Sequence, residues 1–412
     1  MSTGWTRREF MRLSALGAAG MALAANLEAA EPDPITIEDI EIFPIRYPTV
    51  LHFRFFETPM EPTGRDAVVI KITASDGTVA WGESVPVPRW SYETLEASAV
   101  ALQNYIRPVL IGHNPFDLAG IHAEMNRQIA NGWTTGMPLT KAGIDIALHD
   151  LIGKVTGRNI AELWGRPSGG EVTLSWTLSP GSLDELGDLI AQGKEQGYEH
   201  FNVKVAPDPE FDLEMCRIVR EEVPDGFLWA DANGDYDLST AMQVLPRLAD
   251  VGVPVLEQPI KVNHISGYQR LRELGALPII LDEGMVSPVE VLEYIKLGCC
   301  DGIAMKPARC GGLVSSVQQI EMLENADLMF LGSGLTDPDV SLAASLILYS
   351  AFGLAYPAAL NGPQFLGESV LKEPFDVVNG RVKVPTGPGL GIEVDEDKVR
   401  DLSERTGQIT LV

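Results

Sequence analysis

Short apolar segments alternate with amphipathic segments through the middle of the chain, from about residue 140 to residue 365. Eight of the apolar segments have the length of buried strands, and stretches with helical spacing separate them. The candidate strands are 172–178, 201–205, 227–230, 253–256, 278–281, 302–305, 328–331 and 355–359, of which the last fits the pattern least well. Strands that alternate with helices pair in parallel, so eight such units predict an α/β fold with a (β/α) TIM-type barrel rather than a doubly wound sheet.

A second domain is expected in front of the barrel, because 412 residues exceed what one ordinary core organises. Alternating apolar and polar side chains predict strands at 35–42, 67–72 and 79–83, and helical spacing follows at 92–106 and 117–129. We therefore predict an α+β domain over 31–139, the barrel over 140–370 and a turn-rich C-terminal segment over 371–412.

Residues 1–30 have the pattern of an export signal rather than of the fold. The pair Arg7 and Arg8 precedes a weakly apolar stretch at 13–25 and small residues at 22–30, as in a twin-arginine signal. The apolar stretch is too short, and too rich in Ala and Gly, to span a bilayer comfortably. An amphipathic N-terminal helix is the alternative. We expect a periplasmic or extracellular protein that is exported in its folded state.

The net charge argues against two kinds of partner, and the cysteine spacing argues against a zinc site or a disulfide scaffold. The formal net charge of −26 makes nucleic acid and anionic membranes unsuitable partners. The four cysteines show neither zinc-type CxxC pairs nor the spacing of a disulfide scaffold, and we predict buried free thiols at Cys216, Cys299, Cys300 and Cys310.

Charged side chains close five successive predicted strands: Lys204, Asp231, Glu257, Asp282 and Lys306. Neighbours in this set are about 25 residues apart, close to one strand-plus-helix unit, so all five should face the mouth of the barrel where such enzymes place their sites. Three carboxylates offer the oxygen ligands that Mg²⁺ prefers, and the two lysines could exchange a proton on either face of a bound molecule. Taken singly, each acid could cap a helix and each lysine could be a solvated surface group.

Local motifs make the prediction more specific. The sequences Trp-Ala-Asp-Ala-Asn at 229–233, Leu-Glu-Gln-Pro at 256–259, Leu-Asp-Glu-Gly at 281–284 and Lys-Pro-Ala-Arg-Cys-Gly-Gly at 306–312 resemble the muconate lactonizing subgroup of the enolase superfamily, within the mandelate racemase/muconate lactonizing enzyme family. Segments 142–154, 361–363 and 387–391 are also similar. The resemblance extends over essentially everything after the N-terminal signal.

The resemblance implies a modified barrel with an N-terminal α+β capping domain that the C-terminal segment completes. It implies Asp231, Glu257 and Asp282 as Mg²⁺ ligands, with Lys204 and Lys306 as an acid/base pair on opposite faces of a small-molecule carboxylate. Such enzymes remove the proton α to a carboxylate and stabilise the enediolate on the metal, because an amine cannot remove so weakly acidic a proton unaided. Nearby cations should lower the pKa of both lysines.

Racemisation or epimerisation, cycloisomerisation and dehydration share this step, and two opposed lysines favour the first. The alternative is an exported binding protein of the same fold that has lost turnover. The resemblance also suggests a symmetric homo-oligomer.

Two positions depart from the family pattern. Asn202 stands where relatives carry a second lysine on the Lys204 strand, and Thr336 and Asp337 stand where many relatives place a glutamate. These three residues, with Arg54 in a cap loop and Asn361 after the last predicted strand, are the candidates for substrate binding. Thr336 and Asp337 could instead cap a helix, and the aromatics around Arg54 could simply pack the loop. Arg309 could shape the site near Lys306 or serve as an ion-pair partner.

Overall fold

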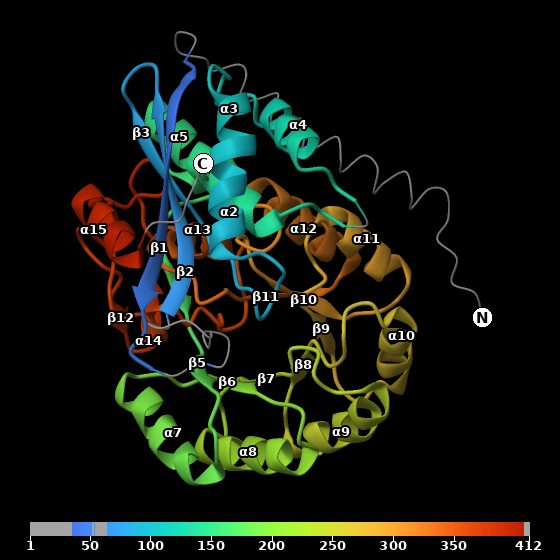
Figure 1. The fold of residues 1–412 in the computed structure, drawn as a ribbon. Coiled ribbons are helices and arrows are strands. Elements are labelled where there is room, and N and C mark those ends of the chain that lie inside the picture. Colours follow the sequence, from blue (N-terminus) through green and yellow to red (C-terminus); the bar gives the residue numbers. More distant parts are fainter. Residues whose placement is uncertain (1–34, 52, 54–63, 133, 408–412) are drawn as a thin grey trace.

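The computed structural model describes residues 35–51, 53, 64–132 and 134–407, and Figure 1 shows how they are arranged. The predicted export signal and Arg54 lie outside these residues. A three-stranded sheet with its helices stands beside a larger ring of strands and helices.

The smaller sheet is antiparallel and runs in the order β1 (Ile37–Pro48), β2 (Gly64–Ala74), β3 (Val79–Ser84). Side chains alternate between its two faces, as the period-two sequence pattern requires. Val68 and Ile70 pack with the helices of this domain, whereas Ala67 and Val69 belong to the core shared with the barrel. The helices are α2 (Leu95–Ala101), a π-helical turn (Leu102–Ile106), α3 (Arg107–Leu110) and α4 (Leu118–Gln128).

Helix α5 (Pro138–Thr156) lies directly on β3 and is buried along most of its length. Two glycines permit this contact, because a Cβ added at Gly82 would come within 1.9 Å of the Gly143 carbonyl oxygen. The helix that the sequence assigned to the start of the barrel therefore also packs on the capping sheet, and the domain boundaries stay predictions.

Seven parallel strands form the barrel wall, in sequence order from β5 to β11. They are β5 (Trp176–Leu178), β6 (Phe201–Lys204), β7 (Leu228–Asp231), β8 (Val255–Glu257), β9 (Ile279–Leu281), β10 (Gly302–Met305) and β11 (Met329–Gly332). Trp229, Val255, Ile280, Ala304 and Leu331, one from each of five neighbouring strands, form a buried cluster with Ala359.

The two ends of the predicted strand series need correction. The segment 355–359 forms only isolated parallel bridges, Ala358 with Leu174 and Ala359 with Ser333, which close the wall between β5 and β11. Pro357 has no backbone N–H to donate to a regular ladder. The segment 172–178 divides into β4 (Glu171–Thr173) and β5, because β4 pairs instead with β13 (Arg381–Lys383), which also pairs with β12 (Val377–Val378).

Helices follow the strands around the outside of the barrel (Figure 1). They are α7 (Leu186–Glu195), α8 (Pro209–Glu222), α9 (Leu238–Val251), α10 (Ile265–Leu274), α11 (Pro288–Lys296), α12 (Leu313–Ala326) and α13 (Asp339–Ala351). Shorter helices are α6 (Ile160–Leu163), a 3₁₀ turn (Leu183–Glu185) and α14 (Gly362–Phe365). Asp208 and Asp237 cap α8 and α9 through their side chains, which satisfies backbone N–H groups at those helix starts.

The C-terminal segment returns to the capping domain, as the sequence predicts. Helix α15 (Glu396–Thr406) packs on β1, and Thr406 Oγ1 accepts a hydrogen bond of 2.8 Å from the Arg46 N–H. All four cysteines are buried free thiols, which confirms that prediction. Across the described ranges, no helix is both long and apolar enough to cross a membrane.

Glu83 of β3 joins the capping sheet to the barrel helix α13. Its buried carboxylate accepts hydrogen bonds from the Tyr47 hydroxyl at 2.9 Å and from the N–H groups of Val340 at 3.2 Å and Ser341 at 3.0 Å. Burial raises the pKa of Glu83 to about 7, with a further upward contribution from Asp339 and opposing hydrogen bonds from Ser341 and Tyr47. The folded protein therefore keeps the Glu83 proton at pH values where the unfolded chain has lost it.

Glu83→Gln tests this link. Because the folded-state pKa is raised, Glu83 adds stability that is fully present below its ordinary pKa of 4.5 and is lost as pH rises through about 7. An amide keeps all three contacts, since its NH₂ can donate to the Tyr47 oxygen. As pH rises from about 4.5 to 8, the free energy of unfolding of the variant, measured in urea, should increase by on the order of 2–3 kcal/mol relative to that of the unsubstituted protein. Exposed Glu373→Gln is the control. If the unfolding free energies of Glu83→Gln and of the unsubstituted protein change with pH in parallel, the raised pKa of Glu83 is contradicted.

Candidate active site

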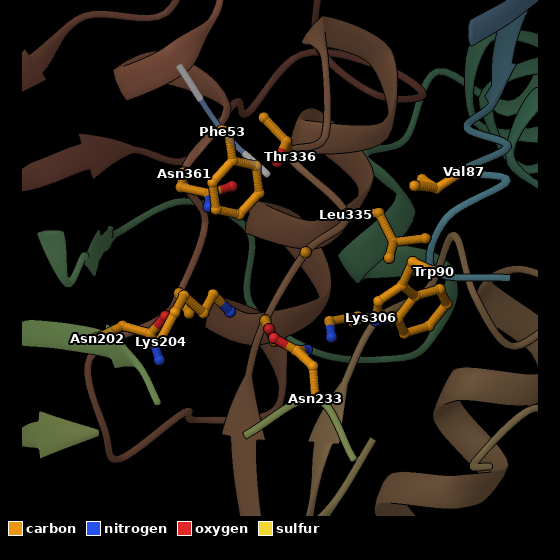
Figure 2. A pocket seen from close by; sticks show the side chains of 13 residues that line it. Phe53, Val87, Trp90, Asn202, Lys204, Asn233, Lys306, Leu335, Thr336 and Asn361 are labelled. Atoms are coloured by element: carbon orange, nitrogen blue, oxygen red, sulfur yellow. The ribbon is translucent and has the colours of Figure 1, made fainter. Parts of the chain in front are cut away.

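A pocket lies where the C-terminal ends of the barrel strands meet the capping domain. Its lining combines charged, amide, hydroxyl and apolar side chains from both domains. Barrel residues on its wall are Asn202, Lys204, Asn233, Lys306, Ser333, Gly334, Leu335, Thr336, Ala359 and Asn361, and the capping domain adds Phe53, Val87 and Trp90. Figure 2 shows the Lys204 and Lys306 side chains entering this pocket from opposite sides.

The three predicted acidic ligands occupy neighbouring strand ends. Asp231 and Glu257 are the last residues of β7 and β8 and are paired in register, and Asp282 follows β9 directly. All three carboxylates are buried, with at most 1% of each residue exposed. Burial raises the pKa of Glu257 well above its usual range, and the nearby charges of Asp231 and Asp282 raise it further. The three acids therefore repel one another in a region with little solvent.

Three cations offset this repulsion. Lys204 Nζ lies 2.5 Å from Asp231 Oδ2. Lys306 Nζ contacts Asp282 and lies 3.6 Å from Glu257 Oε1, and fully buried Arg309 contacts the other oxygen of Asp282. Although burial would raise the pKa of Asp282, Lys306 and Arg309 hold it below its usual range. Arg309 is thus the ion-pair partner that the sequence allowed as one of two possibilities.

The protein's own groups act on the pKa of Lys306 in opposite directions, and its lowering by nearby cations at a metal-bound site stays a prediction. Burial lowers the pKa of Lys306, but Asp282 and Glu257 more than offset that effect, so the pKa lies above its ordinary value. The carboxylates lie at ion-pair distance from the ammonium group, which accounts for this direction in the protein alone.

The oxygen atoms of the acids fit a hard cation in type. Glu257 Oε1 is buried and has no hydrogen-bond partner within the described part of the chain. Carboxylate oxygens are ligands that Mg²⁺ accepts, and an unpartnered buried acceptor beside two further acids is a position that a cation would satisfy. Among the described residues, no three acid, His or Cys side chains converge on one point as they stand, and the ammonium groups of Lys204 and Lys306 contact the two aspartates.

Two amides complete the polar wall of the pocket. Asn202 lies two residues before Lys204 on β6, so both side chains face the same way, and both line the pocket. The Oδ1 atoms of Asn202 and Asn361 are buried without a hydrogen-bond partner in the described ranges, while their NH₂ groups reach Trp229 O and Thr177 Oγ1 at 3.3 Å. The wall therefore carries polar groups with unused hydrogen-bonding capacity.

The structure separates the paired candidates Thr336 and Asp337. Thr336 lines the pocket. Asp337 does not belong to the lining, and its carboxylate accepts hydrogen bonds from Leu335 N–H and Ser345 Oγ, each at 3.0 Å. Burial raises the pKa of Asp337. Neither residue caps α13, whose N-cap is Pro338.

Sequence reasoning did not assign individual roles to several residues of the site. Trp90 places its ring 5.0 Å from Lys306 Nζ, close enough for a cation–π contact. Asn233 donates from its side chain to Glu283 at 3.1 Å. Burial and the charges of Asp282 and Asp231 raise the pKa of Glu283 to about 8. Asn233 and Glu283 stand inside the recognised motifs, one or two residues beyond a predicted ligand, and that position was the available signal.

Comparison with known proteins agrees with the geometry. Residues 56–165 match the mandelate racemase / muconate lactonizing enzyme N-terminal domain, and residues 185–398 match the enolase C-terminal domain-like family. The chloromuconate cycloisomerase of Cupriavidus necator is 31% identical over 339 residues, 81% of this chain and 90% of that protein. The N-succinyl-L-Arg/Lys racemase of Bacillus cereus is 26% identical over 362 residues, 87% of this chain and 95% of that protein. The crystal structure of 2-chloromuconate cycloisomerase from Rhodococcus opacus 1CP has 27% identity and a TM-score of 0.81, covering 89% of this chain and 99% of that one.

The parallel strands, the capping domain and the pocket that two lysines enter at the strand ends define the class as a TIM-type barrel with a capping domain. The chain belongs to the enolase superfamily, and within it to the mandelate racemase/muconate lactonizing enzyme family. It is an enzyme of the isomerase kind found in that superfamily.

Proposed function

We propose that this enzyme is a Mg²⁺-dependent isomerase that removes the proton α to a carboxylate in a small anionic substrate and returns a proton to the product. The observation that carries the proposal is the placement of Lys204 and Lys306 on opposite sides of a pocket beside three buried carboxylates. Each lysine then serves one face of the reacting carbon.

Asp231, Glu257 and Asp282 would hold the metal. When bound there, Mg²⁺ supplies positive charge that stabilises the anion developing on the substrate carboxylate and lowers the pKa of nearby lysines. The unpartnered Glu257 Oε1 supports this assignment, because a buried acceptor without a donor is costly unless a cation or a donor satisfies it.

The chain's own residues would do the remaining work. One lysine Nζ takes the proton from its face and the other returns a proton on the opposite face, which gives racemisation. Cycloisomerisation would use the same anion in another order: a substrate carboxylate oxygen adds to a conjugated double bond, whose π electrons move to form the enediolate, and one lysine then donates a proton to the α carbon. The Asn202 and Asn361 amides offer neutral contacts to substrate oxygens, and Thr336 offers a hydroxyl. We propose Arg54 as a further substrate contact from the cap loop.

The relatives support isomerisation of carboxylates, since one is named a chloromuconate cycloisomerase and another an N-succinyl-L-Arg/Lys racemase. Muconates and N-succinyl amino acids are therefore the two substrate classes to test. The alternative of an exported binding protein without turnover gains no support from these relatives.

Solvent exchange in D₂O with Mg²⁺ tests the two-lysine arrangement. We expect deuterium uptake at the α carbon of N-succinyl-L-lysine, N-succinyl-L-arginine or their enantiomers, measured by NMR. If muconate is the substrate instead, its conjugated absorbance should decrease. Lys204→Ala and Lys306→Ala should each lower exchange by about 10²–10⁴-fold, each for a different enantiomer. Exposed Lys372→Ala is the control. If both variants lose exchange from the same enantiomer only, the lysines do not serve opposite faces.

We also propose that the enzyme is exported through the twin-arginine pair Arg7–Arg8 and works as a symmetric homo-oligomer in the periplasm or outside the cell. The pair is followed by the apolar and small residues that such signals contain.

Changing Arg7 and Arg8 together to Lys should leave the protein in the cytoplasm, because the export machinery reads that pair. Fractionation followed by N-terminal sequencing checks this, and a mature N-terminus between residues 24 and 31 is expected for the unsubstituted protein. Continued export of the double variant would contradict the twin-arginine assignment.

A further inference from the structure

The loop after β11 supplies four consecutive residues, 333–336, to the pocket wall. Within it, Thr336 has φ of 53°, in the left-handed region. That region is unfavourable for a β-branched residue and persists only where the surroundings hold it. The contacts that hold this loop therefore determine what the pocket presents to a substrate.

The peptide groups of the preceding residue, Leu335, are held at both ends. Its N–H donates to Asp337 Oδ1 at 3.0 Å, and its carbonyl oxygen accepts from Arg65 Nε at 2.8 Å. Asp337 is fixed in turn by Ser345 Oγ at 3.0 Å, and it packs beneath Gly334, where an added Cβ would lie 2.9 Å from Asp337 Oδ2. Leu335 is thus clamped between a cation of the capping domain and an acid of the barrel.

Arg65 also holds the facing wall of the pocket. It stands on β2 with 1% of its surface exposed and donates to the carbonyl oxygens of Val85 at 2.9 Å and Pro86 at 2.8 Å. The next residue, Val87, lines the pocket and accepts a hydrogen bond from the N–H of Trp90, the residue beside Lys306. A guanidinium suits this task because its planar fork donates in several fixed directions at once.

Burying a cation to bind neutral carbonyl groups is expensive unless acids lie nearby. Burial lowers the pKa of Arg65 to about 10, and the charges of Asp337, Asp66 and Glu83 oppose that shift. Arg65 therefore stays charged at neutral pH, and Asp337 contributes to that charge balance as well as to the loop.

We propose that Arg65 and Asp337 are positioning residues that fix the spacing between the two pocket walls, the capping loop at 85–90 and the barrel loop at 333–336, and so set which substrates fit over the lysines. The role in substrate choice rests on the proposed function, whereas the clamp itself does not. Neither residue belongs to the pocket lining, so each acts through Leu335 and its neighbours.

Hydrogen–deuterium exchange of the full-length protein tests the clamp without any substrate. Arg65→Met and Asp337→Ala should speed exchange of the peptide covering 333–337 by about 10-fold or more, the effect of losing a hydrogen bond to a charged group. Arg65→Met should also speed exchange over 84–90, while Asp337→Ala should not. Asp337→Asn keeps both contacts of the side chain and should change little. Exposed Arg217→Met is the matched control, and the β10 peptide 302–305 reports any global loss of stability.

Kinetics then separate positioning from simple structural support. With N-succinyl-L-lysine or muconate, whichever is turned over, Arg65→Met and Asp337→Ala should raise KM about 10-fold and lower kcat much less, because the lysines are untouched. Arg65→Lys should recover part of the loss. If Arg65→Met does not fold, the KM and kcat of Asp337→Ala are compared with those of Asp337→Asn instead.

Unchanged exchange over 333–337 in folded variants would overturn the clamp. Faster loop exchange with unchanged KM would overturn its role in substrate choice. If no carboxylate is turned over by the unsubstituted protein, the proposed function fails, and the exchange experiment still decides whether the clamp exists.

Discussion

The site depends on the mutual repulsion of three buried carboxylates. Two unit charges about 4 Å apart repel by roughly 4 kcal/mol at the effective dielectric constant of a protein, and Asp231, Glu257 and Asp282 occupy adjacent strand ends with little access to solvent. Lys204, Lys306 and Arg309 provide three opposing charges, but they are unevenly distributed: both aspartates have close cationic partners, whereas Lys306 Nζ stands 3.6 Å from Glu257 Oε1. The balance is therefore weakest at Glu257, where a further cation would stabilise the cluster most.

The rest of the molecule keeps this cluster together and covered. Parallel register brings the strand ends to one mouth, the apolar cluster around Trp229 fills the barrel beneath them, and the capping domain places Trp90 and Phe53 above. Phe53 stacks on Phe365 of α14 with ring centroids 4.7 Å apart, so the cap also contacts the end of the barrel segment. Burial of the mouth strengthens every charge interaction inside it, which is the condition that proton transfer from a weak carbon acid requires.

Much of this arrangement could be predicted from the sequence, because the signals are local and repeat. The near-constant spacing of the five strand-end residues and the alternation of strands with helices each depend on short segments. The closure of the barrel could not be predicted in detail, since Pro357 interrupts the last segment and only Ala358 and Ala359 pair. The contacts of Arg65 could not be predicted from the sequence, because its carbonyl partners Val85 and Leu335 lie 20 and 270 residues away along the chain. The pKa of Lys306 depends on the balance between burial and nearby charges, which spacing alone does not show.

Thermal unfolding of Glu257→Gln, with chelator and with added Mg²⁺, tests the central claim most directly. Removing one charge from three repelling acids leaves no broken hydrogen bond at Oε1, so with chelator the variant should be more stable than the unsubstituted protein. Added Mg²⁺ should raise the Tm of the unsubstituted protein, because a ligand that binds only the folded state stabilises it. The variant should respond much less, since it has lost a ligand charge. Equal Mg²⁺ stabilisation of both proteins, or of neither, would contradict a metal site formed by Asp231, Glu257 and Asp282.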